Sequence, residues 1–243
     1  AELGRWPAGR QLRVADVCVG TGSNTAALVE ACQGRGLEML WWGLELDQRP
    51  LQLALADAGF RAQWQPLALA ELEHLAASER LLWGDARQRL PELLTRPQLW
   101  SVEFLSGLGA LLHPQGRLLT YCSAAAVRQG LREAGLCIAS IAAPSGLQQH
   151  LSDWSGGTAA SPSPLPSNQW LRALGVMEEE HLRTNAAEPY RDPSGLAEPA
   201  TILRERQQAQ RQAMASGAVE GTSSWRRRWG LTSSRGNAAE HPK

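Results

Sequence analysis

The chain has 243 residues, of which 43% are hydrophobic and 20% charged, and its 24 basic residues balance its 24 acidic ones. A chain of this length and apolar content buries a sizeable core, which excludes a wholly disordered protein and a short disulfide-stapled scaffold. Lys243 is the single lysine, which argues against Schiff-base chemistry and against a phosphate loop of the Gly-Lys-Ser/Thr type.

Segments that would direct the chain to a membrane or hold a metal are not apparent. No apolar run approaches the roughly 20 residues of a membrane span, and the N-terminus carries no signal-type apolar core. The four cysteines form no Cys-x-x-Cys pair, which argues against a metal site and fits a reducing compartment. We therefore expect a soluble, cytoplasmic protein without a bound metal.

Up to residue 143, short β-rich segments alternate with amphipathic helical stretches. The predicted strands span residues 12–19, 39–46, 80–84, 117–122 and 136–142, and the predicted helices span residues 24–33, 49–59, 66–78, 100–112 and 124–135. This alternation predicts an α/β fold, with a parallel sheet and helices on both faces. Ligands of such folds bind at the carboxyl ends of the strands, near a topological switch point.

A change in composition divides the chain into three predicted parts. These are an α/β domain over residues 1–143, a Ser/Pro/Gly-rich loop over 144–166 and a C-terminal extension with helical pieces over 167–243. In the tail of the extension, Trp225 and Trp229 flank three arginines. Such a composition binds single-stranded RNA, but a Trp-anchored tail with solvated arginines explains the same pattern.

The strongest local motif follows the first predicted strand and opens the first helix. It reads DVCVGTGSN from Asp16 to Asn24. Gly20 and Gly22 permit a sharp turn and the close approach of a ligand to free N–H groups at the helix start. Thr25 takes the place of the third glycine of Gly-x-Gly-x-x-Gly, so a dinucleotide fits poorly.

An acidic residue stands where a ribose would need one. Glu45 ends the second predicted strand 23 residues after Gly22, near the distance at which an acidic side chain binds ribose in nucleotide-binding βαβ units. Asp47 is the alternative ribose ligand, and an exposed charge after a strand is the structural alternative for both. The pattern favours a nucleoside-type ligand with a modest anionic part, such as S-adenosylmethionine.

A third strand end carries another carboxylate. Asp85 follows Gly84 directly after the third predicted strand, at the sheet edge that also carries Gly20 and Glu45. Its carboxylate is a candidate acceptor for the adenine amino group, and an N-cap of the next helix is an equal alternative. The candidate cofactor-binding residues are Asp16, Gly20, Thr21, Gly22, Asn24, Glu45, Asp85 and Ala86.

Four motifs point to one family. The longest is TYCSAAAVRQGLREAGL, from Thr120 to Leu136, and the others are GTGSN, LLWGDA and PQLWSVEFL. Together, across most of residues 14–141, they resemble the MnmC-like methyltransferase domain in its stand-alone, cyanobacterial form. The resemblance implies a Rossmann-like class I S-adenosylmethionine-dependent methyltransferase with a C-terminal extension.

The resemblance also implies a substrate. The family transfers a methyl group to the amine of 5-aminomethyl-2-thiouridine at the wobble position of tRNA, so tRNA is the expected partner. The chain is too short for the FAD-dependent oxidase domain of bifunctional relatives, so a separate oxidase or modification enzyme would act upstream. Tyr121, Ser123 and Ala124 match positions beside the family's substrate pocket, although a core or cap role explains them equally well.

Two features depart from the family's pattern. Asp16 and Cys18 replace a Glu and a Gly of its opening motif, changes that keep charge and small size. Between Leu94 and Pro97 only two residues stand where the family has an apolar central strand that ends in an Asp beside the substrate amine. Either this strand is deleted, or a mobile segment is left out of the printed sequence, and no catalytic base is assigned.

Two other functions stay open. One is a methyltransferase of the same fold with a small-molecule substrate, which would methylate metabolites but not tRNA. The other is a non-catalytic protein that binds S-adenosylmethionine or RNA and has lost its central active-site strand. It would bind the cofactor without turnover.

Overall fold

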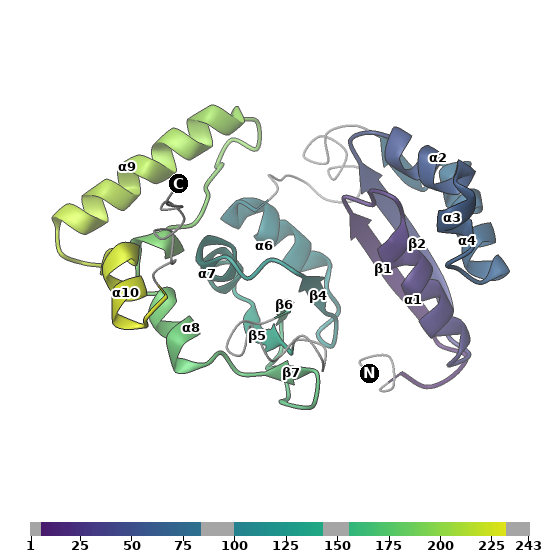
Figure 1. Ribbon diagram of the computed structural model, residues 1–243, viewed down its shortest axis with the longest axis horizontal. Coiled ribbons are helices and arrows are strands. Elements are labelled where there is room, and N and C mark those ends of the chain that lie inside the picture. The colour runs from purple at the N-terminus through teal and green to yellow at the C-terminus, as the bar shows by residue number, and fades with distance from the viewer. Residues whose placement is uncertain (1–5, 84–99, 143–155, 232–243) are drawn as a thin grey trace, which may run out of the picture. The chain divides into compact units, whose positions relative to one another are not determined.

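The computed structural model describes residues 6–83, 100–142 and 156–231. The chain divides into two compact units, Ala1–Leu99 and Trp100–Lys243, which are described separately below (Figure 1).

The first unit is built on a parallel sheet whose strand order is β1-β2-β3. Its elements are β1 (Gln11–Val17), α1 (Ser23–Gln33), β2 (Glu38–Glu45), α2 (Arg49–Ala56), α3 (Ala58–Arg61), α4 (Pro66–Ala76) and β3 (Leu81–Trp83). Trp41 and Leu81 of the sheet pack in one buried cluster with Val29 of α1, Leu51 of α2 and Leu72 of α4. Burial of this cluster fixes the helices against the sheet and so positions the loops at the strand ends.

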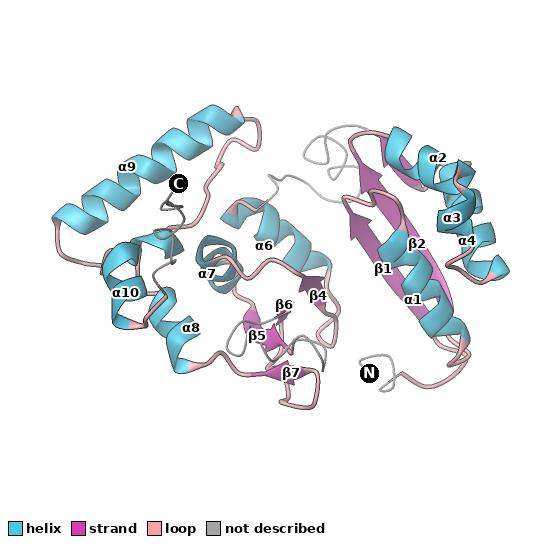
Figure 2. Cartoon of the chain, viewed as in Figure 1, coloured by secondary structure: helices cyan, strands magenta, loops and turns pink. Residues whose placement is uncertain are grey.

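The second unit is built on an antiparallel sheet of order β4-β6-β5-β7 (Figure 2). Its elements are α6 (Val102–Leu111), β4 (Leu118–Thr120), α7 (Ala125–Glu133), β5 (Cys137–Ile141), β6 (Gly157–Ser161), β7 (Leu171–Arg172), α8 (Val176–His181), η3 (Asn185–Ala187), α9 (Pro199–Ala215) and α10 (Thr222–Arg228). The single parallel sheet predicted from the alternation is therefore wrong for the strands of this unit, because β6 inserts between β4 and β5 in the opposite direction.

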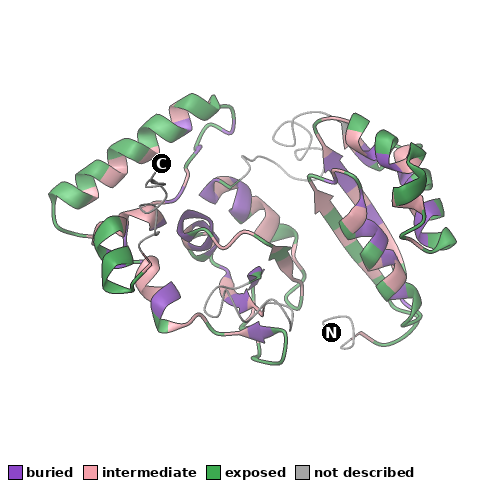
Figure 3. Cartoon of the chain, viewed as in Figure 1, coloured by how far each residue is buried: buried purple, intermediate pink, exposed green. Residues whose placement is uncertain are grey.

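Strand β6 corrects a second expectation. Residues 144–166 were predicted to form a loop, yet residues 157–161 are all buried between two other strands (Figure 3). The sequence of β6 is Gly-Thr-Ala-Ala-Ser, which lacks the large β-branched and aromatic residues that mark most strands. Its small side chains allow neighbours to pack closely over it, so tertiary contacts decide its conformation.

The C-terminal extension is built into the second unit. The Val102 N–H at the start of α6 donates to the Tyr190 carbonyl at 3.0 Å, and the Asp192 N–H donates to Glu103 at 2.8 Å. Together with β6, these bonds tie residues beyond 156 to the elements before 143. The boundary expected at residue 143 therefore does not separate two independent bodies.

The segment between Leu94 and Pro97, where the sequence lacks the family's central strand, lies outside the described residues. Among the described strands, β1 pairs with β2 alone and β4 pairs with β6 alone. No helix of the described residues has the length and apolarity needed to cross a membrane.

Candidate functional site

The glycine motif forms a tight loop between β1 and α1. Cys18, Gly20 and Gly22 all have positive φ angles, of 63°, 58° and 82°, so the chain reverses sharply. A Cβ at Gly22 would lie 2.8 Å from Leu72 Cδ2 and 3.0 Å from Leu51 Cδ1, so only glycine fits there. A Cβ at Gly20 would meet only the Cys18 carbonyl oxygen, at 3.9 Å, which leaves the space over this part of the loop open.

Glu45 reaches this loop from the end of β2. The Gly20 N–H donates to Glu45 Oε2 at 2.6 Å, and the Leu46 N–H donates to Oε1 at 2.7 Å. The Asp47 N–H makes a third, longer bond to Oε1 at 3.4 Å. A carboxylate has about four acceptor positions, so three backbone donors leave it able to accept one further hydrogen bond. The structure thus brings together the two residues that sequence spacing had paired.

Asp16 lies at the same strand ends. The Thr25 hydroxyl donates to Asp16 Oδ2 at 2.6 Å, and Thr25 is only 3% exposed. Burial raises the pKa of Asp16, the bond from Thr25 opposes this shift, and the nearby charge of Glu45 adds to it. Thr25, which replaces the third glycine, therefore holds the Asp16 carboxylate in place. The neighbouring carboxylates of Asp16 and Glu45 together attract a positively charged ligand.

Asp47, the alternative ribose ligand, is engaged elsewhere. Its carboxylate accepts bonds from the Arg49 guanidinium at 2.5–2.9 Å. These bonds and one from the Arg49 backbone lower the pKa of Asp47 to about 2. The pair is solvent-exposed and makes no bond to the glycine loop, so Glu45 is the better placed of the two acidic residues.

The other cofactor candidates are placed less firmly. Thr21 is exposed in the loop, with its hydroxyl 2.9 Å from that of Ser23. Asn24 is exposed in the first turn of α1. Asp85 and Ala86 lie outside the described residues.

The proposed substrate-side residues follow β4 in the second unit. Tyr121 is 77% exposed, Ser123 is half-buried and Ala124 is the N-cap residue of α7. The Thr158 hydroxyl donates to the Cys122 carbonyl at 2.7 Å. A Cβ on Gly157 would collide with the Thr120 carbonyl oxygen and lie 2.7 Å from Tyr121 Cα. The start of β6 therefore supports this loop from beneath.

A buried ion pair, which the sequence analysis missed, holds that support in place. Arg128 is 3% exposed, and its guanidinium donates to Glu178 at 2.8 Å, to Thr158 at 3.0 Å and to Ser140 at 3.2 Å. Glu178 also accepts a bond from Arg172 at 2.5 Å. The signal was available, because Arg128 lies three residues from both Ala125 and Leu131 on the buried side of α7.

Hydrogen bonding keeps Glu178 ionised. Burial acts to raise its pKa, but bonds from the Gly175 N–H, Arg172, Ser140 and Arg128 together lower the pKa to about 2. A buried charge with this many partners is a structural group and has no lone pairs to spare for a ligand.

The Arg/Trp tail folds back on the second unit. Trp225 is buried and stacks on His181, with ring centroids 4.2 Å apart. Arg228 forms ion pairs with Glu180 and, at 2.6 Å, with Glu220. The Trp-anchored alternative is therefore supported by the buried Trp225 and by Arg226 and Arg227, which are exposed as it expects, whereas Arg228 is paired with two glutamates.

Within the first unit, the site unites Asp16, Gly20 and Glu45 at the carboxyl ends of two parallel strands. This arrangement can hold a nucleoside through its hydroxyls and attract a positive charge. Within the described ranges, no three His, Cys, Asp or Glu side chains group so as to hold a metal ion, and the four cysteines are free thiols.

Comparison with known proteins finds similarity to a family model, to a curated protein and to a solved structure. Residues 61–145 match the family model described as S-adenosyl-L-methionine-dependent methyltransferase. The tRNA 5-methylaminomethyl-2-thiouridine biosynthesis bifunctional protein MnmC of Cupriavidus necator is 35% identical over 119 residues, covering 41% of this chain and 17% of that protein. The crystal structure of MnmC2 from Aquifex aeolicus matches with a TM-score of 0.62 at 21% identity, covering 83% of this chain and 68% of that one.

These matches support different conclusions about the chain. The chain spans 17% of the length of the curated relative, so the activity of that whole protein does not transfer directly. At 21% identity, the solved structure is evidence for the fold alone.

Proposed function

We propose that this chain methylates the aminomethyl group of 5-aminomethyl-2-thiouridine at the wobble position of tRNA. The premise is that it carries an S-adenosyl-L-methionine-dependent methyltransferase domain of the MnmC type, with a Rossmann-like fold. The observation that carries the methyltransferase assignment is the 2.6 Å bond between the Gly20 N–H and Glu45, which joins the glycine loop to the acidic strand end. The choice of substrate rests on the relative named for this tRNA modification.

The residues of the first unit fit S-adenosyl-L-methionine. The open space over Gly20 admits a ligand to the backbone, and the acceptor position left on Glu45 suits a ribose hydroxyl. Asp16 and Glu45 together favour a cationic ligand at this end of the sheet. The cofactor, when bound, supplies a methyl group activated by a positively charged sulfur.

The remaining tasks of the protein are positioning and proton removal. A neutral amine attacks the methyl carbon in line, so the amine must be held close and deprotonated. In this proposal Tyr121 and Ser123 line the substrate side, on the loop that Thr158 supports. The residue that takes the amine proton is not assigned, because residues 84–99, where the family's Asp would belong, lie outside the described residues.

The proposal is tested with the purified chain, S-adenosyl-L-methionine carrying an isotopically labelled methyl group, and tRNA that bears 5-aminomethyl-2-thiouridine. Mass spectrometry of the digested tRNA should find labelled 5-methylaminomethyl-2-thiouridine. The matched control is the same tRNA with an unsubstituted 2-thiouridine, which lacks the accepting amine and should take up no label.

Other results would select a different function. Cofactor binding in calorimetry with no label in either tRNA would contradict the proposed activity and favour a non-catalytic binding protein. Label in free metabolites but not in tRNA would favour a small-molecule methyltransferase.

A further inference from the structure

A groove in the second unit lies far along the chain from the glycine loop and has no role in the function proposed above. It has a volume of about 310 Å³ and is lined by Asn185, Gln207, Gln210, Arg211 and Met214. We call this set the amide groove. Its volume is at the lower end of the range for small-ligand pockets, so it admits one small group.

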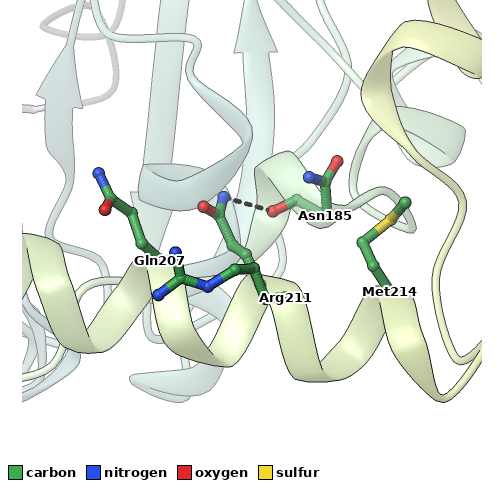
Figure 4. Close-up of a pocket in the computed structure, with 5 residues that line it drawn as sticks. Asn185, Gln207, Arg211 and Met214 are labelled. Atoms are coloured by element: carbon green, nitrogen blue, oxygen red, sulfur yellow. Dashed lines mark hydrogen bonds between the residues drawn. The ribbon is translucent and has the colours of Figure 1, made fainter.

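Three elements build the amide groove. Residues 207, 210, 211 and 214 follow the i, i+3, i+4, i+7 spacing that lines one face of an α-helix, here α9. Gln207, Arg211 and Met214 extend from α9 on the side that faces Asn185 of η3 (Figure 4). Gln210 Nε2 donates to the Asn185 carbonyl at 2.7 Å, which fixes the distance between α9 and η3 at this point.

The third element, α10, orients the Asn185 side chain. Asn185 Oδ1 accepts bonds from the Thr222 N–H at 2.9 Å and the Thr222 hydroxyl at 2.6 Å. Two donors on the oxygen leave the amide nitrogen as the group available to a ligand. Met214 lines the groove and lies near the start of α10, since a Cβ on Gly221 would lie 3.1 Å from its methyl group.

The groove therefore offers mixed hydrogen-bonding groups beside an apolar surface. Asn185 Nδ2 is a donor, Gln210 Oε1 is an acceptor and the Gln207 amide is both. None of these three groups bonds to another described residue, and Gln207 and Arg211 are exposed. Paired donors and acceptors next to a guanidinium match the edge of a nucleobase and its phosphate.

The surrounding charge favours an anion. Residues 199–231 contain six arginines and two glutamates, whereas the whole chain has no net charge. Three of these arginines bond within the protein: Arg206 bonds to the Glu188 carbonyl at 2.6 Å, Arg204 bonds to the Thr201 hydroxyl at 3.2 Å, and Arg228 pairs with Glu180 and Glu220. Arg211 in the groove and Arg226 and Arg227 on α10 remain exposed.

We propose that the amide groove binds one unstacked nucleotide of an RNA, with Arg211 on its phosphate and Gln207 and Asn185 on the edge of its base. Arg226 and Arg227 extend the contact to neighbouring phosphates. This inference rests on the proposed function only for the identity of the RNA, which would be the tRNA substrate. The groove is then a docking site on the second unit, separate from the residues that hold the cofactor.

The test measures binding of a fluorescein-labelled RNA hairpin, built like a tRNA anticodon arm, to the full chain by fluorescence anisotropy over a series of salt concentrations. Arg211→Gln should weaken binding about three- to tenfold, as for loss of one charge-assisted contact, and lower the salt slope by about one. Gln207→Ala should weaken hairpin binding while leaving the salt slope unchanged, because it removes no charge.

Two matched controls isolate the groove. Arg35→Gln removes one exposed arginine from the loop before β2, and Gln208→Ala changes the exposed neighbour of Gln207 on another side of α9. Both controls should bind the hairpin like the unmodified chain. Equal binding by Arg211→Gln, Gln207→Ala and the controls would overturn the inference.

Two further results would also overturn it. If Gln207→Ala has no effect and Arg211→Gln weakens binding of a DNA duplex as much as that of the hairpin, the groove contacts phosphate groups only and does not recognise a base. If an Asp/Glu-rich peptide displaces the hairpin from the unmodified chain but binds Arg211→Gln poorly, the groove serves an acidic protein. Groove-dependent binding without methyl transfer would leave the inference standing and contradict the proposed function instead.

Discussion

The two units use their charged residues in opposite ways. In the first unit, Asp16 and Glu45 lie half-buried at the ends of parallel strands, and Glu45 is held by three backbone N–H groups. In the second unit, Arg128 and Glu178 are buried beneath an antiparallel sheet, and each bonds to several protein groups. The first arrangement leaves acceptor positions for a ligand, whereas the second uses them to fix the fold.

This difference gives a criterion for telling candidate binding residues from residues that support the fold. A carboxylate that keeps lone pairs at a strand end can serve a ligand at little cost in stability. A buried carboxylate whose partners are all within the protein stabilises the fold, and removal of its buried cationic partner leaves the charge poorly compensated. The predictions below test this contrast, starting with the largest expected effect.

Breaking the buried ion pair should have the largest effect on stability. Arg128→Met leaves Glu178 without its buried partner and should lower the free energy of unfolding by about 3–5 kcal/mol, measured by urea denaturation. The matched control is Arg132→Gln, because Arg132 also joins α7 to α8, through an exposed pair with Glu179 at 2.5 Å. Loss of that exposed pair should cost about 0–1 kcal/mol. Equal losses in both variants would contradict the assigned roles.

The pH dependence of stability should have opposite signs in the two units. The folded-state pKa of Glu178 is about 2, below its ordinary value of 4.5, so its contribution is present above about pH 5 and is lost as the pH falls toward 2. That loss should reach about 3 kcal/mol. An NMR titration of the Glu178 carboxyl carbon measures the pKa directly, and a midpoint near 4.5 would refute the prediction.

Asp16 supplies the other half of the pH comparison. Its pKa is raised by burial, so the folded first unit binds this proton more tightly than the unfolded chain does. Its ionisation therefore lowers stability as the pH rises from its ordinary value of 3.8 toward the raised one. Asp16→Asn should remove this decrease, and urea denaturation between pH 4 and pH 7 measures it. A variant with the same slope as the unmodified chain would count against the account.

A smaller effect is expected from the support beneath the loop after β4. Gly157→Ala puts a Cβ against the Thr120 carbonyl and should destabilise the second unit by about 1–3 kcal/mol, the usual cost of overpacking. Gly135→Ala is the control: Gly135 also has a positive φ angle, but nothing lies within 4 Å of its added Cβ. The control measures backbone strain alone, so the difference between the two denaturation midpoints reports the collision. No difference would mean that β6 does not support the loop.

Sequence patterns predicted the elements up to residue 142 well, because their apolar residues repeat with clear periods of two or of three to four. The junction of Gly20 with Glu45 was also predictable, since parallel strands bring their carboxyl ends to one edge. Both are local or near-local properties of the chain.

What sequence reasoning missed depends on contacts between distant residues. Strand β6 has a weak intrinsic preference for its conformation, and only pairing with β4 and β5 defines it. Arg128 and Glu178 are 50 residues apart, so neither shows its partner in the sequence. Likewise, the residues of the amide groove come together only when η3, α9 and α10 pack against one another.

The central claim is that Glu45, and not Asp47, holds the cofactor. Its most direct test is to measure the affinity for S-adenosyl-L-methionine by isothermal titration calorimetry. Glu45→Gln should weaken binding by about 1–3 kcal/mol, the loss expected for hydrogen bonds to a charged group. Asp47→Asn should bind like the unmodified chain, because Asp47 is paired with Arg49. Unchanged affinity in Glu45→Gln, or an equal loss in both variants, would contradict the site described for the first unit.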